Sequence, residues 1–430
     1  MSPHWFALLL LAQQPPASVQ QKQVAALVGQ IRRLAASEPV VFGVDTRIRT
    51  AEVLTKKYPK IAKDLLRDAS AAAGGITAAA EQDEMRVRIV EGMAPLDFEE
   101  AEHLIGSIHR GGDEDYVAEA YDKLVQFVAR THGNPREMIS RGLAAGGFRS
   151  GSAAKQLEKP SDAQELFAEI LSAFPPSPHD EDIAYLLART KQIIGVNRAL
   201  AIEAINKALS AAKSQKLLRD IGAILGSIDP ELLKRYQSEN EAFASAMAAP
   251  EPPPAAEEKQ ELNTPDLSGL SYSEALSQAR KLDDPGARAD ALIEIYRRDN
   301  ITSQQRDTVA SEALAAVSAM PLSNSKLLGL AMISRDFARN NEPANAAFAA
   351  QALSETYSKA CDCGGATCVK SKEPFDCLQL VEDFAKYLDE FKISPESMNL
   401  DNISLEARLL LLKLYPLLGM KTPSLWLSDN

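Results

Sequence analysis

Aromatic residues are scarce in this chain of 430 residues, at 6% of the sequence, although hydrophobic residues make up 45%. The core must therefore be aliphatic and rich in alanine, which suits packed helices better than β-sandwiches. Alternation of β-branched with polar residues, the pattern of a half-buried strand, is also nearly absent. These absences argue against a β-sheet protein and predict an all-α fold.

Positive charge is in deficit as well, because 47 Lys and Arg residues face 59 Asp and Glu residues, a formal net charge of -12. A nucleic-acid-binding protein needs a basic face that displaces counterions from the phosphates. No dense run of Lys or Arg supplies such a face. We therefore expect no nucleic-acid partner.

Long apolar runs are missing too, since none reaches the roughly 18 residues that a membrane-spanning helix requires. The shorter run from Trp5 to Ala12 is followed by Gln, Pro and small residues, as in the apolar region and cleavage zone of a secretory signal. The residues before it include His4 but no Lys or Arg, and no cysteine near the cleavage zone offers a lipid attachment site. We predict a signal peptide at residues 1–17 and export to the periplasm or the extracellular space. A buried N-terminal segment is the alternative.

The stretch from Ser325 to Ser358 has the pattern of a complete helical hairpin. The first apolar stripe consists of Leu327, Leu330, Ile333 and Phe337, and the second of Ala346, Ala350, Leu353 and Tyr357. Between them, Asn-Asn-Glu-Pro ends one helix and places Pro343 where the next can begin. One hairpin cannot bury both stripes, so we expect similar hairpins to stack on it.

Similar apolar periodicity recurs from about residue 20 to 246 and again after 270. Between these regions, APEPPPAAEEKQELNTPDLSG is rich in proline and acid and has no apolar stripe, which is typical of a linker. We therefore predict an N-terminal helical-repeat domain at 18–247, a disordered linker at 248–269 and a C-terminal helical-repeat domain at 270–430.

The segment SEALSQARKLDDPGARADALIEIYRR resembles one unit of the bacterial helix-turn-helix repeats that are related loosely to tetratricopeptide and HEAT arrays, and NEPANAAFAAQAL is similar to its turn. No single repeat matches the full tetratricopeptide signature. The resemblance implies antiparallel helical hairpins stacked as an α-solenoid, in two parts joined by the Pro/Glu-rich linker, and often a scaffolding role.

The four cysteines of the chain cluster in CDCGGATCVKSKEPFDC, as Cys361, Cys363, Cys368 and Cys377. In an oxidising compartment an even, compact set favours two disulfides that staple one loop. A bond between Cys361 and Cys363 would close a small strained ring, so a crossed or nested pairing with the other two is expected. A four-thiolate zinc site is the rival interpretation, although the usual C-x2-C spacing is missing, and free thiols are the third.

Histidines offer little further metal chemistry. Glu100 and His103 would share one face of a helix, as in di-iron bundles, but a second Glu-x-x-His is absent from the sequence. Acids at Asp113, Glu114 and Asp115 follow, and an exposed acidic turn is the simpler account of them. We expect no metal, cofactor or catalytic residues.

Taken together, these patterns predict a non-catalytic protein-interaction scaffold of the bacterial cell envelope, which binds a protein partner on a helical-repeat surface. The alternative is an enzyme whose carboxylate-lined site, with acids such as Asp113 to Asp115, forms at the junction of the two helical parts. The sequence does not identify the partner.

Overall fold

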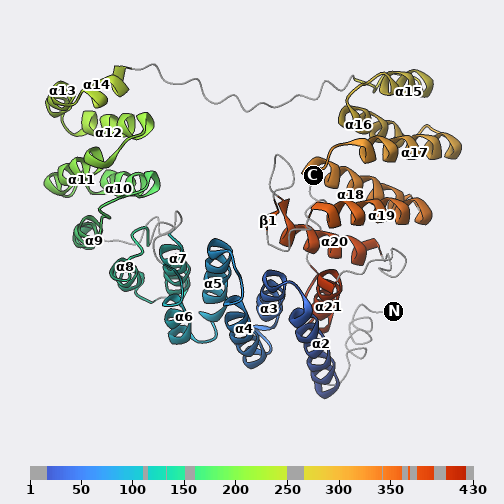
Figure 1. Ribbon diagram of the computed structural model, residues 1–430, viewed down its shortest axis with the longest axis horizontal. Helices are drawn as coiled ribbons and strands as arrows, with labels where there is room; N and C mark the ends of the chain where they lie inside the picture. The colour runs from blue at the N-terminus through green and yellow to red at the C-terminus, as the bar shows by residue number, and fades with distance from the viewer. Residues whose placement is uncertain are drawn as a thin grey trace, which may run out of the picture. The chain divides into compact units, whose positions relative to one another are not determined.

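The protein is described by a computed structural model that covers residues 17–109, 115–131, 133–150, 160–248, 266–340, 342–360, 367–368, 375–391 and 403–422. Nearly all regular structure in these residues is helical, as Figure 1 shows, so the all-α prediction is confirmed. Contacts between residues divide the chain into a first unit, Met1–Lys57 with Ala256–Asn430, and a second unit, Tyr58–Ala255.

The first unit joins helices from both ends of the chain. They are α2 (Ala17–Ser37), α3 (Val40–Leu54), α15 (Tyr272–Arg280), α16 (Pro285–Tyr296), α17 (Ser303–Ala319), α18 (Asn324–Arg339), α19 (Pro343–Ala360), α20 (Cys377–Phe391) and α21 (Ile403–Leu417). Both α2 and α3 pack against α21. The sequence patterns contain no sign of this meeting of the two ends. The predicted linker lies largely outside the described residues, as does the predicted signal peptide.

The second unit contains eleven helices among its described residues. They are α4 (Pro59–Ala73), α5 (Ala79–Met93), α6 (Phe98–Ile105), α7 (Tyr116–Arg130), α8 (Pro135–Ala144), α9 (Pro160–Ser172), α10 (Asp180–Ile193), α11 (Arg198–Ala211), α12 (Gln215–Ile228), α13 (Pro230–Glu239) and α14 (Glu241–Ala248). Successive helices contact each other, and so do the pairs α5–α7, α10–α12 and α12–α14, which lie two elements apart.

Helix starts in both units follow from local chemistry. The Asp229 carboxylate accepts hydrogen bonds from the backbone N–H groups of Glu231 and Leu232, at 3.0 and 3.1 Å, and Pro230 takes the first position of α13. Asp284 and Pro285 open α16 in the same way. Such caps satisfy N–H groups that have no partner inside the helix, and proline needs none there.

The predicted hairpin is confirmed as α18 and α19. All eight stripe residues are buried, at 0–6% exposure, and Pro343 is the first residue of α19. Around this hairpin, α16 pairs with α17, while α16 contacts α18 and α18 contacts α20. Within the first unit, α16, α18 and α20 thus form one layer. Helices α17 and α19 form a second layer that packs against it.

A short pair of strands accompanies the helices. β1 (Thr367–Cys368) and β2 (Phe375–Asp376) pair antiparallel, with Thr367 opposite Asp376 and Cys368 opposite Phe375. Two residues are too few to produce a visible alternation in the sequence, which is why the pair was missed.

No helix within the described ranges combines the length and the apolar composition that crossing a bilayer demands.

Candidate functional site

The cysteine cluster lies at the start of α20. Cys377 is the first residue of that helix, is 0% exposed and is disulfide-bonded. Cys361 and Cys363 lie outside the described residues, and of Cys368 only the backbone, in β1, is described. The pairing and the two-disulfide staple therefore stay predictions.

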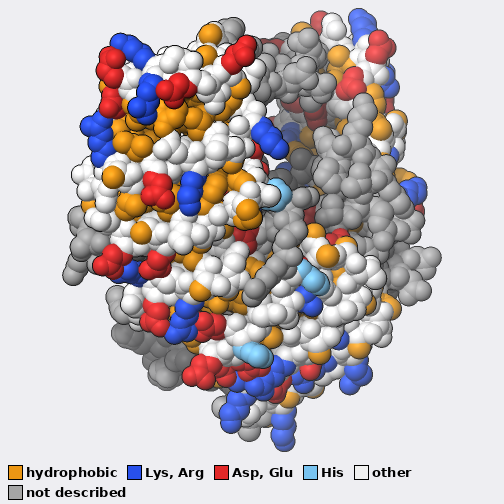
Figure 2. Space-filling model, turned by 60° about the vertical axis from the view of Figure 1, so that its left-hand side comes forward, with side chains coloured by type: hydrophobic (Ala, Val, Ile, Leu, Met, Phe, Trp, Pro, Cys, Tyr) orange, Lys and Arg blue, Asp and Glu red, His pale blue; other side chains and the backbone are white. Residues whose placement is uncertain are grey.

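The acid and histidine weighed as metal ligands on α6 are not brought together with others. Glu100 is bound instead by two cations, with Arg67 Nε 2.6 Å and Lys63 Nζ 3.1 Å from its carboxylate oxygens, and His103 is exposed. These cations hold the pKa of Glu100 below its usual value, chiefly through the hydrogen bond from Arg67. Histidine side chains visible in Figure 2 lie apart from one another. Over the described part of the chain, no group of three or more His, Cys, Asp or Glu residues could hold a metal ion.

The acidic turn of the enzyme hypothesis is described only at Asp115. Its Oδ1 accepts a hydrogen bond from the N–H of Ala118 at 3.0 Å and caps α7, and Oδ2 accepts from the N–H of Arg149 at 3.4 Å. Asp113 and Glu114 lie outside the described residues. Asp115 thus has a structural role in starting a helix and holding the loop after α8.

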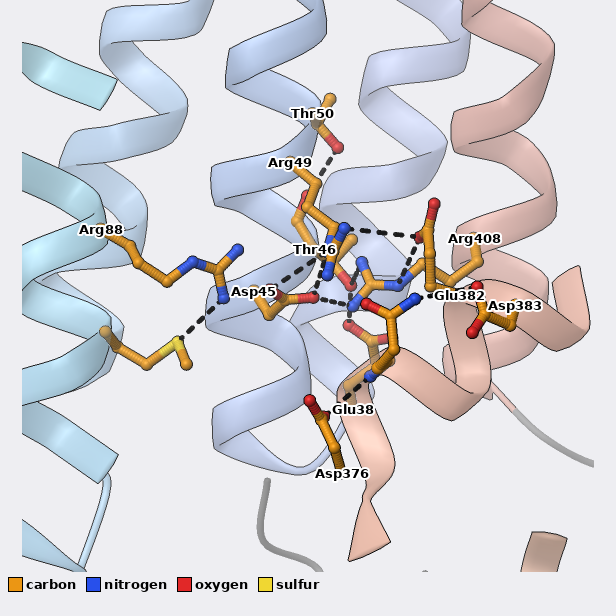
Figure 3. Close-up of polar contacts among 12 residues, drawn as sticks. Glu38, Asp45, Thr46, Arg49, Thr50, Arg88, Asp376, Glu382, Asp383 and Arg408 are labelled. Carbon is orange, nitrogen blue, oxygen red and sulfur yellow. Dashed lines mark hydrogen bonds and ion pairs between the residues drawn. The ribbon is translucent and has the colours of Figure 1, made fainter. Parts of the chain in front are cut away.

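A buried charged network joins α3 to α20 and α21 in the first unit (Figure 3). Arg408 on α21 is 0% exposed and forms an ion pair with Asp45, which is also 0% exposed. Its Nη1 donates to Thr46 Oγ1 at 2.9 Å, and its Nε lies 3.7 Å from Glu382 Oε2 on α20. Burying an arginine is tolerated only when its charge and donors find such partners.

Further contacts extend this network, which we call the Arg408 network. Thr46 Oγ1 donates to Glu38 Oε2 at 2.8 Å, so this hydroxyl links Glu38 to the arginine. Arg49 Nε lies 3.0 Å from Asp45 Oδ2, and Lys386 Nζ lies 3.4 Å from Glu382 Oε1. Because the central groups are buried, they are not accessible to a substrate. Their arrangement instead holds the first two described helices against the last two.

Glu38 makes this network sensitive to pH. Burial raises the pKa of the Glu38 carboxyl, and the charge of Asp45 adds to that rise. Arg408 and the hydrogen bonds from Thr46 and Ser404 act against it without cancelling it. The folded chain therefore binds this proton more tightly than the unfolded chain does. Ionisation of Glu38 lowers the stability as the pH rises from 4.5, the ordinary pKa of the carboxyl, through its raised pKa in the folded protein.

We therefore expect Glu38→Gln to be more stable than the wild type at about pH 7, with the difference vanishing towards about pH 4, where Glu38 is protonated. Urea denaturation at a series of pH values measures it. Glu274→Gln serves as the control of opposite sign, because hydrogen bonds from the Ser271 side chain and backbone lower the pKa of Glu274. A Glu38 variant that is less stable than the wild type at neutral pH would contradict this account.

The described surface of the first unit includes a groove between α17 and α19. This α17–α19 groove has a volume of about 510 Å³, and its walls include Asp307, Ser311, Leu314, Ser318, Asn345 and Phe348. The α17 wall consists largely of small residues, which leave the groove open: Ala310, Ser311, Ala315 and Ser318. Phe348 is 67% exposed at its edge, whereas the other large hydrophobic residues exposed in the described parts reach at most 45%.

The analysis of the sequence missed Phe348, although a local signal was present. Phe348 follows the buried Ala346 by two residues, which turns it about 200° around the helix and away from the apolar stripe. A phenylalanine there must point outward once the stripe is buried.

A second groove lies between α16 and α18, closed at one end by the turn after α17. This α16–α18 groove has a volume of about 560 Å³, and its walls include Asp284, Asp290, Ile293, Met320, Pro321 and Met332. Gly329 brings α18 close to α17 behind it, since a Cβ at that position would lie 3.2 Å from Val317. The two grooves thus flank α18 on its two sides.

Both grooves depend on the placement of α18, which the Arg408 network supports indirectly: α18 packs against α20, and α20 carries Glu382.

Compared with protein-family models and with curated proteins, the chain matches no family model and no curated protein.

Proposed function

We propose that this chain is a non-catalytic scaffold of the bacterial cell envelope that binds a protein partner on the surface of an α-solenoid of stacked helical hairpins. The recurring contacts between helices two elements apart, such as α16 with α18 and α10 with α12, support the repeat architecture. Export is supported by the apolar run at residues 5–12 and by a disulfide-bonded Cys377 in the only cysteine cluster of the sequence.

The observation that carries this proposal is the exposed Phe348 at the edge of the α17–α19 groove. Leaving a phenyl ring in water forgoes about 1.5–3 kcal/mol of burial energy. Aromatic side chains beside a concave surface are typical anchors of protein interfaces. The groove follows α17 from Asp307 to Ser318, about 16 Å along the helix axis. Its length and its mixture of polar and apolar walls suit a segment of a protein better than a compact metabolite.

The experiment places a photo-reactive benzoylphenylalanine at position 348 in the full chain and crosslinks it in the intact native cells. We expect a reproducible adduct with one envelope protein, identified by mass spectrometry. The matched control carries the same amino acid at position 196, because Val196 is also an exposed hydrophobic residue, at 45%, but lies in the second unit. No adduct at 348, or the same adducts at both positions, would overturn the proposal.

Phe348→Ala should weaken the interaction that the crosslink detects by at least about tenfold, the range expected for an aromatic anchor. Recovery of the partner with affinity-tagged variants measures this. Unchanged recovery would remove Phe348 from the interface and with it the main support for this groove.

A further inference from the structure

The α16–α18 groove carries two acids, Asp284 and Asp290, that take part in no ion pair among the described residues. Asp284 Oδ2 accepts the N–H of Ala287 at 2.7 Å, and Asp290 lies less than two turns further along α16. No lysine or arginine lines the groove. Neighbouring acids have cationic partners: Glu312 pairs with Arg280, and Asp336 lies 2.8 Å from the Nη2 of Arg297. No described ion pair involves Asp284 or Asp290.

The titration of Asp290 agrees with this picture. Partial burial raises the pKa of its carboxyl most, and the charge of Asp284 raises it further, whereas the charge of Arg297 lowers it without cancelling the rise. A positive charge brought into the groove would relieve both effects, because it would replace lost hydration and offset the neighbouring acid.

Apart from Ser323 and Ser325, the remaining walls of the groove are apolar. Ile293 lies one turn of α16 beyond Asp290, and Met320, Pro321 and Met332 close the other sides. Lysine and arginine bury a long aliphatic stem along apolar surface while their charged head stays with water or an acid. Methionines are flexible enough to adapt to such a stem. The groove therefore matches a cationic side chain in both its charged and its apolar parts.

We propose that the α16–α18 groove binds a lysine or arginine side chain of a protein partner, with the stem against the methionines and the charged head at Asp290. The inference rests on the proposed scaffold function and adds the chemistry that the partner must present. The net charge of -12 also favours a basic partner, because it attracts positive charge at longer range. It also disfavours a second copy of this chain as the occupant.

The test uses the full chain as the target for a displayed library of random 12-residue peptides. Enriched peptides are synthesised with a fluorescent label, and their binding is measured by fluorescence anisotropy. We expect enrichment of Lys and Arg, and about tenfold weaker binding to Asp290→Asn, since one close charge pair is lost. Asp299→Asn is the matched control, because Asp299 is exposed in the same unit but outside the groove. Binding to this control should be unchanged.

Four results would overturn the inference. Peptides without enriched basic residues, or peptides that bind Asp290→Asn as well as the wild type, would show that the groove does not select a cation. Peptides sensitive only to Phe348→Ala would do the same while leaving the scaffold function intact. A change of oligomeric state in Asp290→Asn, measured by sedimentation, would assign the groove to a second copy. The crosslink at position 348 judges the scaffold function separately.

Discussion

Arg408→Ala is expected to destabilise the first unit by about 3–5 kcal/mol, the cost of removing one partner from a buried ion pair. The substitution removes the buried cation from Asp45, which is 0% exposed and keeps the partly exposed Arg49, and it removes the donor to Thr46. Glu382, 5% exposed, loses its neighbouring guanidinium but keeps Lys386. The weaker compensation of the buried Asp45 charge, rather than the lost packing alone, accounts for most of the expected effect.

Hydrogen–deuterium exchange of peptides from α3, α20 and α21 localises the effect, because exchange reports opening of each element separately. The control is Arg280→Ala, which removes an arginine 53% exposed and paired with Glu312; it should cost no more than about 1 kcal/mol. Adding Asp45→Asn to Arg408→Ala should recover part of the loss, because the buried negative charge that Arg408 compensated disappears. If Arg408→Ala behaves like Arg280→Ala, the network does not hold these helices together.

Phe337→Ala is expected to cost about 3–5 kcal/mol, the range for truncating a buried phenylalanine. Phe337 is 2% exposed on α18 and meets the ring of Tyr296 edge to face, with centroids 5.4 Å apart and an angle of 79° between the rings. Truncation would leave a cavity between α16 and α18 and remove this aromatic contact. The midpoint of urea denaturation, followed by circular dichroism, measures the loss.

Phe348→Ala is the matched control, since the same atoms are removed from a side chain that is 67% exposed in the neighbouring helix. Its stability should stay within about 0.5 kcal/mol of the wild type. The pair separates two roles: stabilisation of the fold, expected of Phe337, and contact with a partner, proposed for Phe348. Equal losses from both substitutions would contradict the assignment of Phe348 to a free surface.

Much of the local structure could be predicted because its causes lie within a few residues. The stripes of α18 and α19 follow from spacings of three and four residues, and Pro343 marks the start of α19 from its missing N–H. Asp284-Pro285 and Asp229-Pro230 open helices for the same local reasons. The two-residue strands could not be predicted, because so short a pairing leaves no periodic pattern in the sequence.

The candidate sites were less accessible from the sequence. Phe348 could have been found as the aromatic residue opposite a buried stripe. The acidic groove could not, because Asp290 and Met332 meet only through the packing of α16 beside α18. The sequence patterns drew attention to Glu100, weighed with His103 as a metal ligand, and to Asp115, weighed as part of an exposed turn or an enzyme site. In the structure Glu100 forms ion pairs and Asp115 caps α7.

The sequence by itself determined that this protein is built of helices, where several of them begin, and which faces they bury, since these properties depend on short-range periodicity and on backbone hydrogen bonding. Only the tertiary structure decided that Arg408 meets Asp45 across 363 positions of sequence, and that two grooves flank α18. Contacts at such separations depend on how whole helices pack. No local pattern specifies which buried charge will meet which.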